Sequence, residues 1–315
     1  MNEKIICPLC NENNTAVVER IKTNELVRLW KRQNVDTSKL FQNEDILEKL
    51  VCNNCGLKHF NPFISGDNDF YSKLGEEEWY YLHEDKTEFE YSNKYIKEGD
   101  SVLDVGSGRG AFLKHIDKKI KYTGLELSSR AVEYAKKDNI NVIENTIEDY
   151  SINNKKSHDV VVTFQVLEHI ANIDSFLEAA VNVVKPNGII IIAVPNNESF
   201  IKDCQNHLLN LPPHHLLHWN EKSLKYIAYK YNLEIVNIYK EKLTNIHRKW
   251  HDTIVLSKTI HDILGMEIKT INMSFTSNII NKISSLIVRI FRMKSVDTQK
   301  HGMTIAIALR KIKNA

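Results

Sequence analysis

From Gly99 onward the sequence alternates between short apolar runs and longer amphipathic stretches, and this alternation restricts the fold more than any other feature. The apolar runs have the length of buried strands, and the amphipathic stretches have helical spacing. The pattern predicts strands at 101–105, 122–127, 141–144, 159–164 and 189–194, and helices at 111–116, 129–137 and 176–184. Such an order is typical of a parallel sheet with helices on both faces, which binds its ligand at the carboxyl ends of the strands.

The first predicted strand is followed by the glycine-rich run GSGRG at residues 106–110. Glycines let the backbone turn sharply and approach a ligand closely, and the run lies between a predicted strand and a predicted helix. Asp104 precedes the first glycine by two residues, where a carboxylate would repel a pyrophosphate but can pair with an ammonium group. Glu126 ends the second strand, where a carboxylate can hold ribose hydroxyls. These two carboxylates favour S-adenosylmethionine over NAD as the cofactor.

At this point the chain resembles the class I S-adenosylmethionine-dependent methyltransferases. The resemblance rests on five stretches in the right order, which are VLDVGSGRG (102–110), GLELS (124–128), HDVVVTFQVLEHI (158–170), VVKPNGIIIIAVPN (183–196) and PPHHLLHWN (212–220). It implies an α/β fold, a Rossmann-like seven-stranded sheet with helices on both faces. The nearest group is similar to the ubiquinone-biosynthesis O-methyltransferases. Many such enzymes with an N-terminal four-cysteine zinc module act in bacterial sugar or polysaccharide pathways.

The resemblance also implies roles for individual positions. Asp104, Gly106 and Gly108 would flank the methionine part of the cofactor, and Glu126 would hold its ribose. Leu127 would pack near the adenine, while Phe164 and Gln165 would line the methyl-donor site. Thr146 stands where relatives often have an aspartate that contacts the adenine amino group, so a backbone contact at Ile147 is the expected substitute. The cofactor residues implied in this way are Asp104, Gly106, Gly108, Glu126, Leu127, Thr146, Ile147, Phe164 and Gln165.

Four of the five cysteines form two C-x-x-C pairs, Cys7 with Cys10 and Cys52 with Cys55. Zinc binds four thiolates in a tetrahedron, and a C-x-x-C turn offers two of them from one tight loop. Because all four ligands would be cysteines, no coordination position stays open, and the zinc would be structural. The alternatives are a disulfide or a redox pair. We expect zinc, in a small zinc-ribbon-like module at the N-terminus.

Histidines occur at two places where a proton acceptor is expected. Transfer of a methyl group to a hydroxyl requires loss of the hydroxyl proton, and a neutral imidazole can accept it at pH 7. His169 follows the fourth strand, where it can either serve the active-site rim or, with Glu168, begin a helix and hold the loop. His214 and His215 lie in the stretch PPHHLLHW. We predict His169, His215 and His214 as catalytic candidates, with His215 facing the methyl site and His214 pointing elsewhere.

The rest of PPHHLLHW has a different expected role. His218 and Trp219 are expected to pack this loop against the sheet, and Asn220 is expected to cap the next helix. A metal site on these histidines is disfavoured, because the four cysteines already account for the zinc.

The chain divides into five expected segments. These are a zinc-binding module (1–62), an aromatic-rich helical connector (63–98), a cofactor-binding core (99–241), a basic helical insertion (242–302), and a final strand and tail (303–315). The connector aromatics either pack the modules together or cover the cofactor; they are Trp79, Tyr80, Tyr81, Phe89, Tyr91 and Tyr95. Residues 233–239 and 303–309 are the expected antiparallel edge of the sheet.

The insertion concentrates positive charge. From Lys240 to the end there are 14 Lys and Arg against 5 Asp and Glu, although the whole chain has a net charge of only +2. A helical stripe, Ile279, Ile283, Leu286, Ile287 and Ile290, lies beside Lys282, Arg289, Arg292 and Lys294. Packing or formation of a homodimer is the first interpretation of segment 279–294. Peripheral membrane contact and contact with an anionic substrate are the alternatives.

The expected function is methylation of a small molecule, a sugar, nucleotide sugar or glycan-pathway intermediate, with O-methylation favoured over C-methylation. The first alternative is a ribosomal RNA methyltransferase; residues 1–60 lack the Lys and Arg clusters that phosphate binding needs, which weighs against nucleic acid. The second is a non-catalytic scaffold. No secretion signal is apparent at the N-terminus, so a cytoplasmic location is the default expectation.

Overall fold

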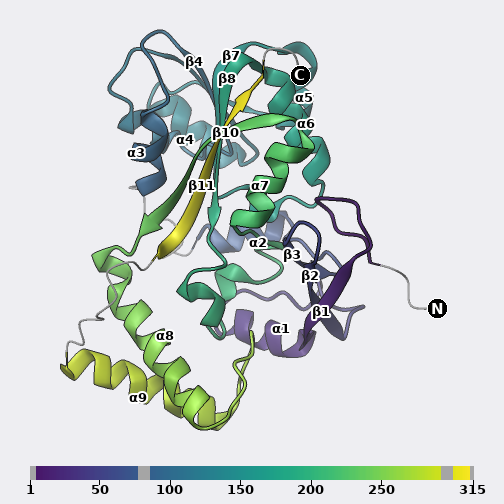
Figure 1. Ribbon diagram of the computed structural model, residues 1–315, viewed down its shortest axis with the longest axis vertical. Helices are drawn as coiled ribbons and strands as arrows, with labels where there is room; N and C mark the ends of the chain where they lie inside the picture. The colour runs from purple at the N-terminus through teal and green to yellow at the C-terminus, as the bar shows by residue number, and fades with distance from the viewer. Residues whose placement is uncertain (1–4, 77–85, 292–300, 313–315) are drawn as a thin grey trace.

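The computed structural model describes residues 5–76, 86–291 and 301–312, and these form two sheets with flanking helices (Figure 1). The larger sheet has seven strands. In spatial order they are β10 (Leu233–Lys242), β11 (His301–Lys311), β8 (Val184–Pro195), β7 (His158–Phe164), β4 (Ser101–Val105), β5 (Lys121–Glu126) and β6 (Val142–Glu144). β11 runs antiparallel to both neighbours, and the other pairings are parallel. The predicted fold class and its antiparallel edge are therefore confirmed.

Successive side chains of the central strands point to opposite faces and build two separate cores. Leu103 and Val161 belong to the core covered by α5 (Ile147–Asn153), α6 (Ile173–Val183) and α7 (Glu221–Lys230). Val102 and Val162 belong to the core covered by α3 (Thr87–Asn93), the 3₁₀ turn η2 (Ala111–His115) and α4 (Ser129–Lys137). Because both faces are covered, these strands are continuous apolar runs in the sequence, as expected of a parallel sheet.

The N-terminal part forms a second, smaller sheet. Its strands are β1 (Thr15–Lys22), β2 (Ile46–Cys52), β3 (Lys58–Asn61) and the short β9 (Leu217–His218), in that order. The helix α1 (Thr23–Lys31) packs on it through the fully buried Trp30 and Leu26. β9 comes from the stretch PPHHLLHW, almost 160 residues after β3, and pairs with the N-terminal sheet, which was not predicted. Trp219, predicted to pack this loop against the main sheet, is fully buried in the core that contains Leu103 and Val161.

The connector contains α2 (Asn68–Leu74) and α3. Phe89 packs on Phe112 and Phe164, with ring centroids 5.3 and 5.0 Å away, and Tyr91 stacks on Tyr239 at 4.8 Å. These described rings therefore pack α3 onto the sheet core. Trp79, Tyr80 and Tyr81 lie outside the described residues.

The insertion between β10 and β11 contains α8 (Asn245–Ile263) and α9 (Phe275–Phe291), which pack on each other at the end of the molecule where the N-terminal module also lies (Figure 1). α9 buries Ser277, Ile280, Ser284 and Val288. Four members of the predicted apolar stripe, Ile279, Ile283, Leu286 and Ile290, are instead 38–62% exposed. Arg292 and Lys294 lie outside the described residues. Among the described residues, no helix has both the length and the apolar character needed to span a membrane.

Candidate active site

The glycine-rich loop at the carboxyl end of β4 has the shape of a ligand cradle. Gly106, Gly108 and Gly110 all have positive φ, at 72°, 55° and 79°, a conformation that favours glycine. The N–H groups of Gly106 and Ser107 both donate to the carbonyl of Leu125, at 2.8 and 3.0 Å, and hold the loop against β5. A Cβ at Gly106 would lie 2.3 Å from Val166 Cγ2, so this glycine also permits a close approach of the segment after β7.

Asp104 is buried beneath this loop. The hydroxyl of Tyr122 donates to its Oδ2 at 2.7 Å, and burial raises the pKa of the carboxyl to about 7. A cation bound nearby would favour the ionised carboxylate. Asp104 therefore fits the predicted partner of an ammonium group.

Glu126, at the end of β5, closes the other side of the cradle. One carboxylate oxygen accepts a hydrogen bond from Gly108 N at 2.9 Å, and the other accepts from Leu127 N and Ser128 N at 2.9 and 2.8 Å. Leu127 is 68% exposed beside it. The carboxylate predicted to hold the ribose is thus joined directly to the glycine loop.

The remaining predicted cofactor residues have identifiable local contacts. Thr146 caps α5, because its hydroxyl accepts from Asp149 N at 3.1 Å, and Ile147 is buried. The ring of Phe164 lies in the aromatic core, 4.8 Å from that of Phe112. Gln165 adopts a positive φ of 58° and donates to Glu88 Oε1 at 3.0 Å. Contact of these residues with a cofactor stays a prediction.

The structure brings the three predicted catalytic histidines together. His169 lies in the 3₁₀ turn η3 (Leu167–His169) after β7, and the loop of His214 and His215 crosses over it. The ring of His169 lies 4.6 Å from that of His214 and 4.7 Å from that of His215, and one ligand atom from each residue lies within 4.8 Å of the others. Since Val166 contacts Gly106, this histidine cluster adjoins the cofactor loop.

The expectation that His214 and His215 point in different directions is wrong. Their rings stack at 4.5 Å with an interplanar angle of 22°. The N–H groups of both residues donate to the carbonyl of Leu211, so the backbone turns here instead of extending. Alternation of side chains holds for a strand and does not apply within such a turn.

Hydrogen bonds fix the orientation of the imidazoles. His169 Nδ1 lies 2.6 Å from the carbonyl of His214, and His215 Nδ1 lies 3.2 Å from Asn210 Oδ1. We assign these contacts to N–H donors, because a carbonyl oxygen can only accept. The Nε2 atom of each neutral ring then carries the lone pair, and both Nε2 atoms face Glu168.

Glu168 is a site residue for which the sequence suggested only that it begins a helix with His169 and holds the loop. Its side chain is buried, and its Oε1 lies 3.8 Å from His215 Nε2 and 4.0 Å from His169 Nε2. Neither carboxylate oxygen makes a hydrogen bond with the described residues. Burial raises the pKa of Glu168 to about 8, and burial lowers that of His169 to about 4 and those of His214 and His215 well below the usual value. Only its adjacency to His169 could have identified it.

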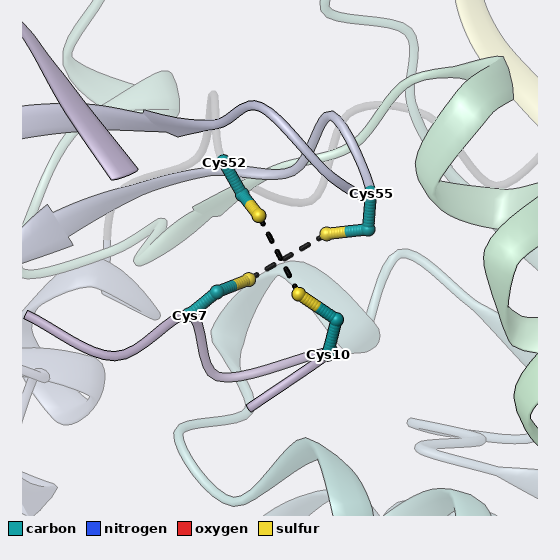
Figure 2. A group of neighbouring side chains, drawn as sticks. All are labelled: Cys7, Cys10, Cys52 and Cys55. Atoms are coloured by element: carbon teal, nitrogen blue, oxygen red, sulfur yellow. Dashed lines mark hydrogen bonds between the residues drawn. The ribbon is translucent and has the colours of Figure 1, made fainter. Parts of the chain in front are cut away.

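The four cysteines predicted to bind zinc converge on one point (Figure 2). The sulfur of Cys7 lies 3.5 Å from that of Cys55, and the sulfur of Cys10 lies 3.4 Å from that of Cys52. A disulfide needs about 2.05 Å, whereas zinc at about 2.3 Å from each thiolate separates the sulfurs by roughly 3.8 Å. The cluster therefore fits a tetrahedral metal better than a disulfide. The Cys55 side chain, followed by the backbone N–H groups of Cys10 and Leu9, lowers the pKa of Cys7 to about 5.

The N-terminal module holds the histidine loop from several sides. β9 pairs with β3, and Phe60 N donates to the carbonyl of Leu216 at 3.2 Å. Trp30 Nε1 donates to the carbonyl of Pro212 at 3.0 Å, and Gly66 N donates to that of Pro213 at 2.8 Å. Asn220, the predicted cap, begins α7 with a capping box, and its amide also donates to the carbonyl of Gly56 at 2.7 Å. The module that contains the cysteines, together with Gly66 of the connector, thus positions the loop of His214 and His215.

Comparison with known proteins gives a consistent result. The profile of a family described as "Methyltransferase domain" matches residues 79–238. Two similar proteins are named ubiquinone biosynthesis O-methyltransferase. The one from Rickettsia prowazekii is 37% identical over 102 residues, and the one from Shewanella halifaxensis is 30% identical over 105. These alignments cover 30% and 31% of this chain.

The same alignments span about two fifths of the relatives' own length, 40% and 44%. Among solved structures, a SAM-dependent methyltransferase from Archaeoglobus fulgidus is 19% identical with a TM-score of 0.49; the match covers 71% of this chain and 91% of that one.

Proposed function

The chain belongs to the methyltransferase-domain family, whose profile matches just over half of it, and from this premise we propose that it transfers the methyl group of S-adenosylmethionine to a hydroxyl oxygen of a small molecule. The observation that carries the proposal is the position of the histidine cluster. Two imidazole Nε2 atoms face a buried carboxylate, and the same segment contacts Gly106 through Val166. A methyl acceptor placed between them would meet the cofactor on one side and a base on the other.

Different residues of the cradle bind different parts of the cofactor. Gly106 and Gly108 admit the backbone to close contact, the Asp104 carboxylate pairs with the ammonium group, and the Glu126 carboxylate accepts from ribose hydroxyls. When bound, the cofactor supplies a sulfonium methyl group that a nucleophile can take by in-line attack. Because its leaving group is a neutral thioether, much of the catalysis comes from positioning.

The histidine cluster accepts the proton that the hydroxyl group loses. Transfer forms an O–CH₃ bond, breaks an S–CH₃ bond and releases one proton, which the Nε2 atom of His215 accepts, with His169 beside it. Positive charge thus passes from the sulfonium to an imidazolium inside the same site. The Glu168 carboxyl lies within 4.0 Å of both Nε2 atoms, and its charged form is favoured once one of the rings becomes a cation. Glu168 therefore stabilises the charge that develops on His215.

The cysteine cluster is proposed to hold a structural zinc ion through Cys7, Cys10, Cys52 and Cys55. Four thiolates leave no position for substrate, so the ion would not take part in methyl transfer. Its effect would be indirect, since the module that it closes is the one that positions His214 and His215.

Two acceptor classes follow from different observations. A sugar or nucleotide sugar follows from the resemblance of the zinc module and core to glycan-pathway methyltransferases. A phenolic acceptor follows from the names of the ubiquinone-biosynthesis relatives. Both present a hydroxyl oxygen, and O-methylation is favoured in either case.

The test is release of S-adenosylhomocysteine by the purified, zinc-loaded chain with a panel of nucleotide sugars and with catechol as a phenolic probe. We expect turnover with at least one class. His215→Ala is expected to lower turnover by roughly 100-fold or more, whereas His247→Ala, on α8, should leave it unchanged. A chain that does not bind S-adenosylmethionine in calorimetry would refute the proposal.

The exposed stripe of α9 is proposed to contact a second copy of the chain. Its apolar residues recur at intervals of three and four and are only partly covered by other described residues, as expected of a helix–helix seam. Sedimentation of the wild type should give a dimer, and Ile283→Glu should give a monomer. Monomers in both samples would exclude this interface, and binding of the wild type to anionic vesicles would then favour the membrane alternative.

A further inference from the structure

A cavity of about 40 Å³ lies where three distant parts of the chain meet. The N-terminal sheet contributes one wall, the loop after β8 contributes a second, and the connection between α8 and α9 closes the third. Its polar lining consists of Lys49, Lys58, Lys202, His207, His218, Asn197, Asn210 and Thr270. Three lysines and two histidines line this small space, which distinguishes it from an ordinary packing defect.

The register of the N-terminal sheet aligns three of these groups. Lys58 on β3 lies directly opposite His218 on β9, and it also lies opposite Val51 on β2. Lys49 is two residues from Val51 and therefore projects from the same face of the sheet. Lys49, Lys58 and His218 thus form one row of basic side chains across three strands.

Positive charge in this row is incompletely compensated. None of the ion pairs within 4.0 Å that the described residues form includes Lys49, Lys58 or Lys202. Lys49 Nζ donates to Thr270 Oγ1 at 3.1 Å, and burial lowers its pKa to about 8, with a further contribution from the charge of Lys58. The charge of Glu19 acts on Lys49 in the opposite direction, and the charge of Asp203 acts on Lys58 and Lys202, but neither carboxylate forms one of these ion pairs. The Glu19 carboxylate accepts from Thr270 N at 2.9 and 3.1 Å.

A buried polar atom supports the same conclusion. His207 Nδ1 is buried and makes no hydrogen bond with the described residues. An unpaired donor or acceptor of this kind carries a cost of about 1–3 kcal/mol unless a ligand or water satisfies it. The cavity therefore combines excess positive charge with unused hydrogen-bonding capacity, which is what an oxyanion site needs.

Asn210 connects this cavity to the histidine cluster. Its backbone carbonyl accepts from His218 Nε2 at 2.7 Å, and its side-chain Oδ1 accepts from His215 Nδ1 at 3.2 Å. Its amide donates to Asn197 Oδ1 at 2.7 Å, so the residue is fixed from both sides. One asparagine thus separates the basic cavity from the proposed base.

We propose that this cavity binds a phosphate-class oxyanion that belongs to the methyl acceptor, as in a sugar phosphate or a nucleoside diphosphate sugar. A volume of about 40 Å³ has room for roughly three water-sized positions, and for the terminal oxygens of one tetrahedral anion after a small adjustment of the lysine side chains. The proposal rests on the proposed methyl transfer for its acceptor part. The anion site itself is independent of turnover and can be tested without it.

The test compares thermal unfolding of the zinc-loaded full chain in inorganic phosphate and in chloride at matched ionic strength. We expect phosphate to stabilise the wild type and the control Lys39→Met, an exposed lysine of the same module. Lys49→Met and Lys58→Met should bind phosphate at least about tenfold more weakly. Without phosphate, Lys49→Met should be as stable as the wild type or more so, because a desolvated and repelled ammonium group is removed.

A cavity that holds only water predicts equal behaviour of all four proteins in phosphate and chloride, and that result would overturn the anion site. To test the acceptor part, a nucleoside diphosphate sugar is compared with inorganic phosphate. We expect the sugar nucleotide to stabilise the wild type against thermal unfolding at a lower concentration than inorganic phosphate does. In Lys49→Met the two ligands should be needed at similar concentrations. Equal protection by both ligands would overturn the acceptor assignment. The affinity of the same variants for S-adenosylmethionine, measured by calorimetry, should equal that of the wild type. This measurement distinguishes failure of the anion-site proposal from failure of the methyltransferase proposal.

Discussion

The two sides of the candidate site are built in different ways. On the cofactor side, Asp104, Gly106, Gly108 and Glu126 lie within 23 residues on two adjacent parallel strands. On the histidine side, His169 and His215 are 46 residues apart, and their loop is held by Trp30, Phe60 and Gly66 of the N-terminal part. The first arrangement follows from one strand–loop–strand unit, whereas the second requires the cysteine module to be folded and docked.

This difference indicates a division of labour. Cofactor affinity should depend on local backbone geometry and tolerate damage to the N-terminal module. Methyl transfer should depend on that module, because its contacts place His214 and His215 over η3. Variants that affect only one of the two sides therefore test whether cofactor binding and methyl transfer depend on different parts of the chain.

The largest effect is expected from loss of a zinc ligand. A structural zinc ion can contribute about 10 kcal/mol to the folding of a small domain, so Cys55→Ser should unfold the N-terminal module and abolish turnover. The control is Cys204→Ser, the fifth cysteine, which packs near Phe200 outside the cluster. Metal analysis should give one zinc per wild-type chain and per Cys204→Ser chain. Two metal equivalents would instead place an ion on the histidines and contradict their role as the base.

A large but local effect is expected on the cofactor side. Gly106→Ala places a Cβ 2.3 Å from Val166 Cγ2 at a positive φ, so it should weaken S-adenosylmethionine binding by about 100-fold or more. Gly108→Ala also has a positive φ but meets no atom within 4 Å, and backbone strain alone should cost roughly tenfold. Calorimetry measures both. Equal losses of S-adenosylmethionine affinity in the two variants would mean that the close approach of Val166 to Gly106 does not affect cofactor binding.

Removal of the buried carboxyl group of Glu168 should affect only the histidine side. Glu168→Gln keeps the shape of the side chain, and we expect turnover to fall by roughly 10- to 100-fold with unchanged cofactor affinity. Stability should be unchanged or higher, because the carboxylate makes no hydrogen bond with the described residues. Glu178→Gln, on the exposed face of α6, is the matched control. A destabilised Glu168→Gln protein would show that the residue is structural.

The smallest effect is expected for Asn220, which both caps α7 and forms a hydrogen bond to the N-terminal module. Asn172 and Asn220 both cap helices, and loss of either cap should cost about 1 kcal/mol. Asn220 also donates to the carbonyl of Gly56, so Asn220→Ala should cost about 1 kcal/mol more than Asn172→Ala. Urea unfolding of the two variants measures this difference. Equal losses in the free energy of unfolding would mean that the hydrogen bond from Asn220 to Gly56 does not stabilise the protein.

Much of the core could be predicted because its determinants are local. The strand–helix alternation predicted the five parallel strands and the antiparallel edge of the sheet, although not their spatial order, and the predicted helix at 129–137 has the bounds of α4. Glycines and carboxylates at strand ends predicted a cofactor side, because the carboxyl ends of parallel strands meet at one edge. Two C-x-x-C pairs identified the cysteine cluster for a similar reason, since their chemistry limits their partners.

The histidine side could be predicted only in outline. The sequence indicated which histidines are candidates for the base, but the pairing of β9 with β3, which helps bring them together, joins segments almost 160 residues apart and has no local signal. The stacking of His214 on His215 depends on a turn held by Leu211, which strand-like alternation does not anticipate. Glu168 was overlooked because burial without a hydrogen-bond partner is a property of the folded chain.

The central claim is that the cofactor cradle is built independently of the module that positions the base. Calorimetric titration of wild type and Cys55→Ser with S-adenosylmethionine tests it most directly. We predict that both proteins bind the cofactor with affinities within a few-fold of each other, while only the wild type transfers the methyl group. Loss of cofactor binding in Cys55→Ser, or its absence in the wild type, would contradict the account.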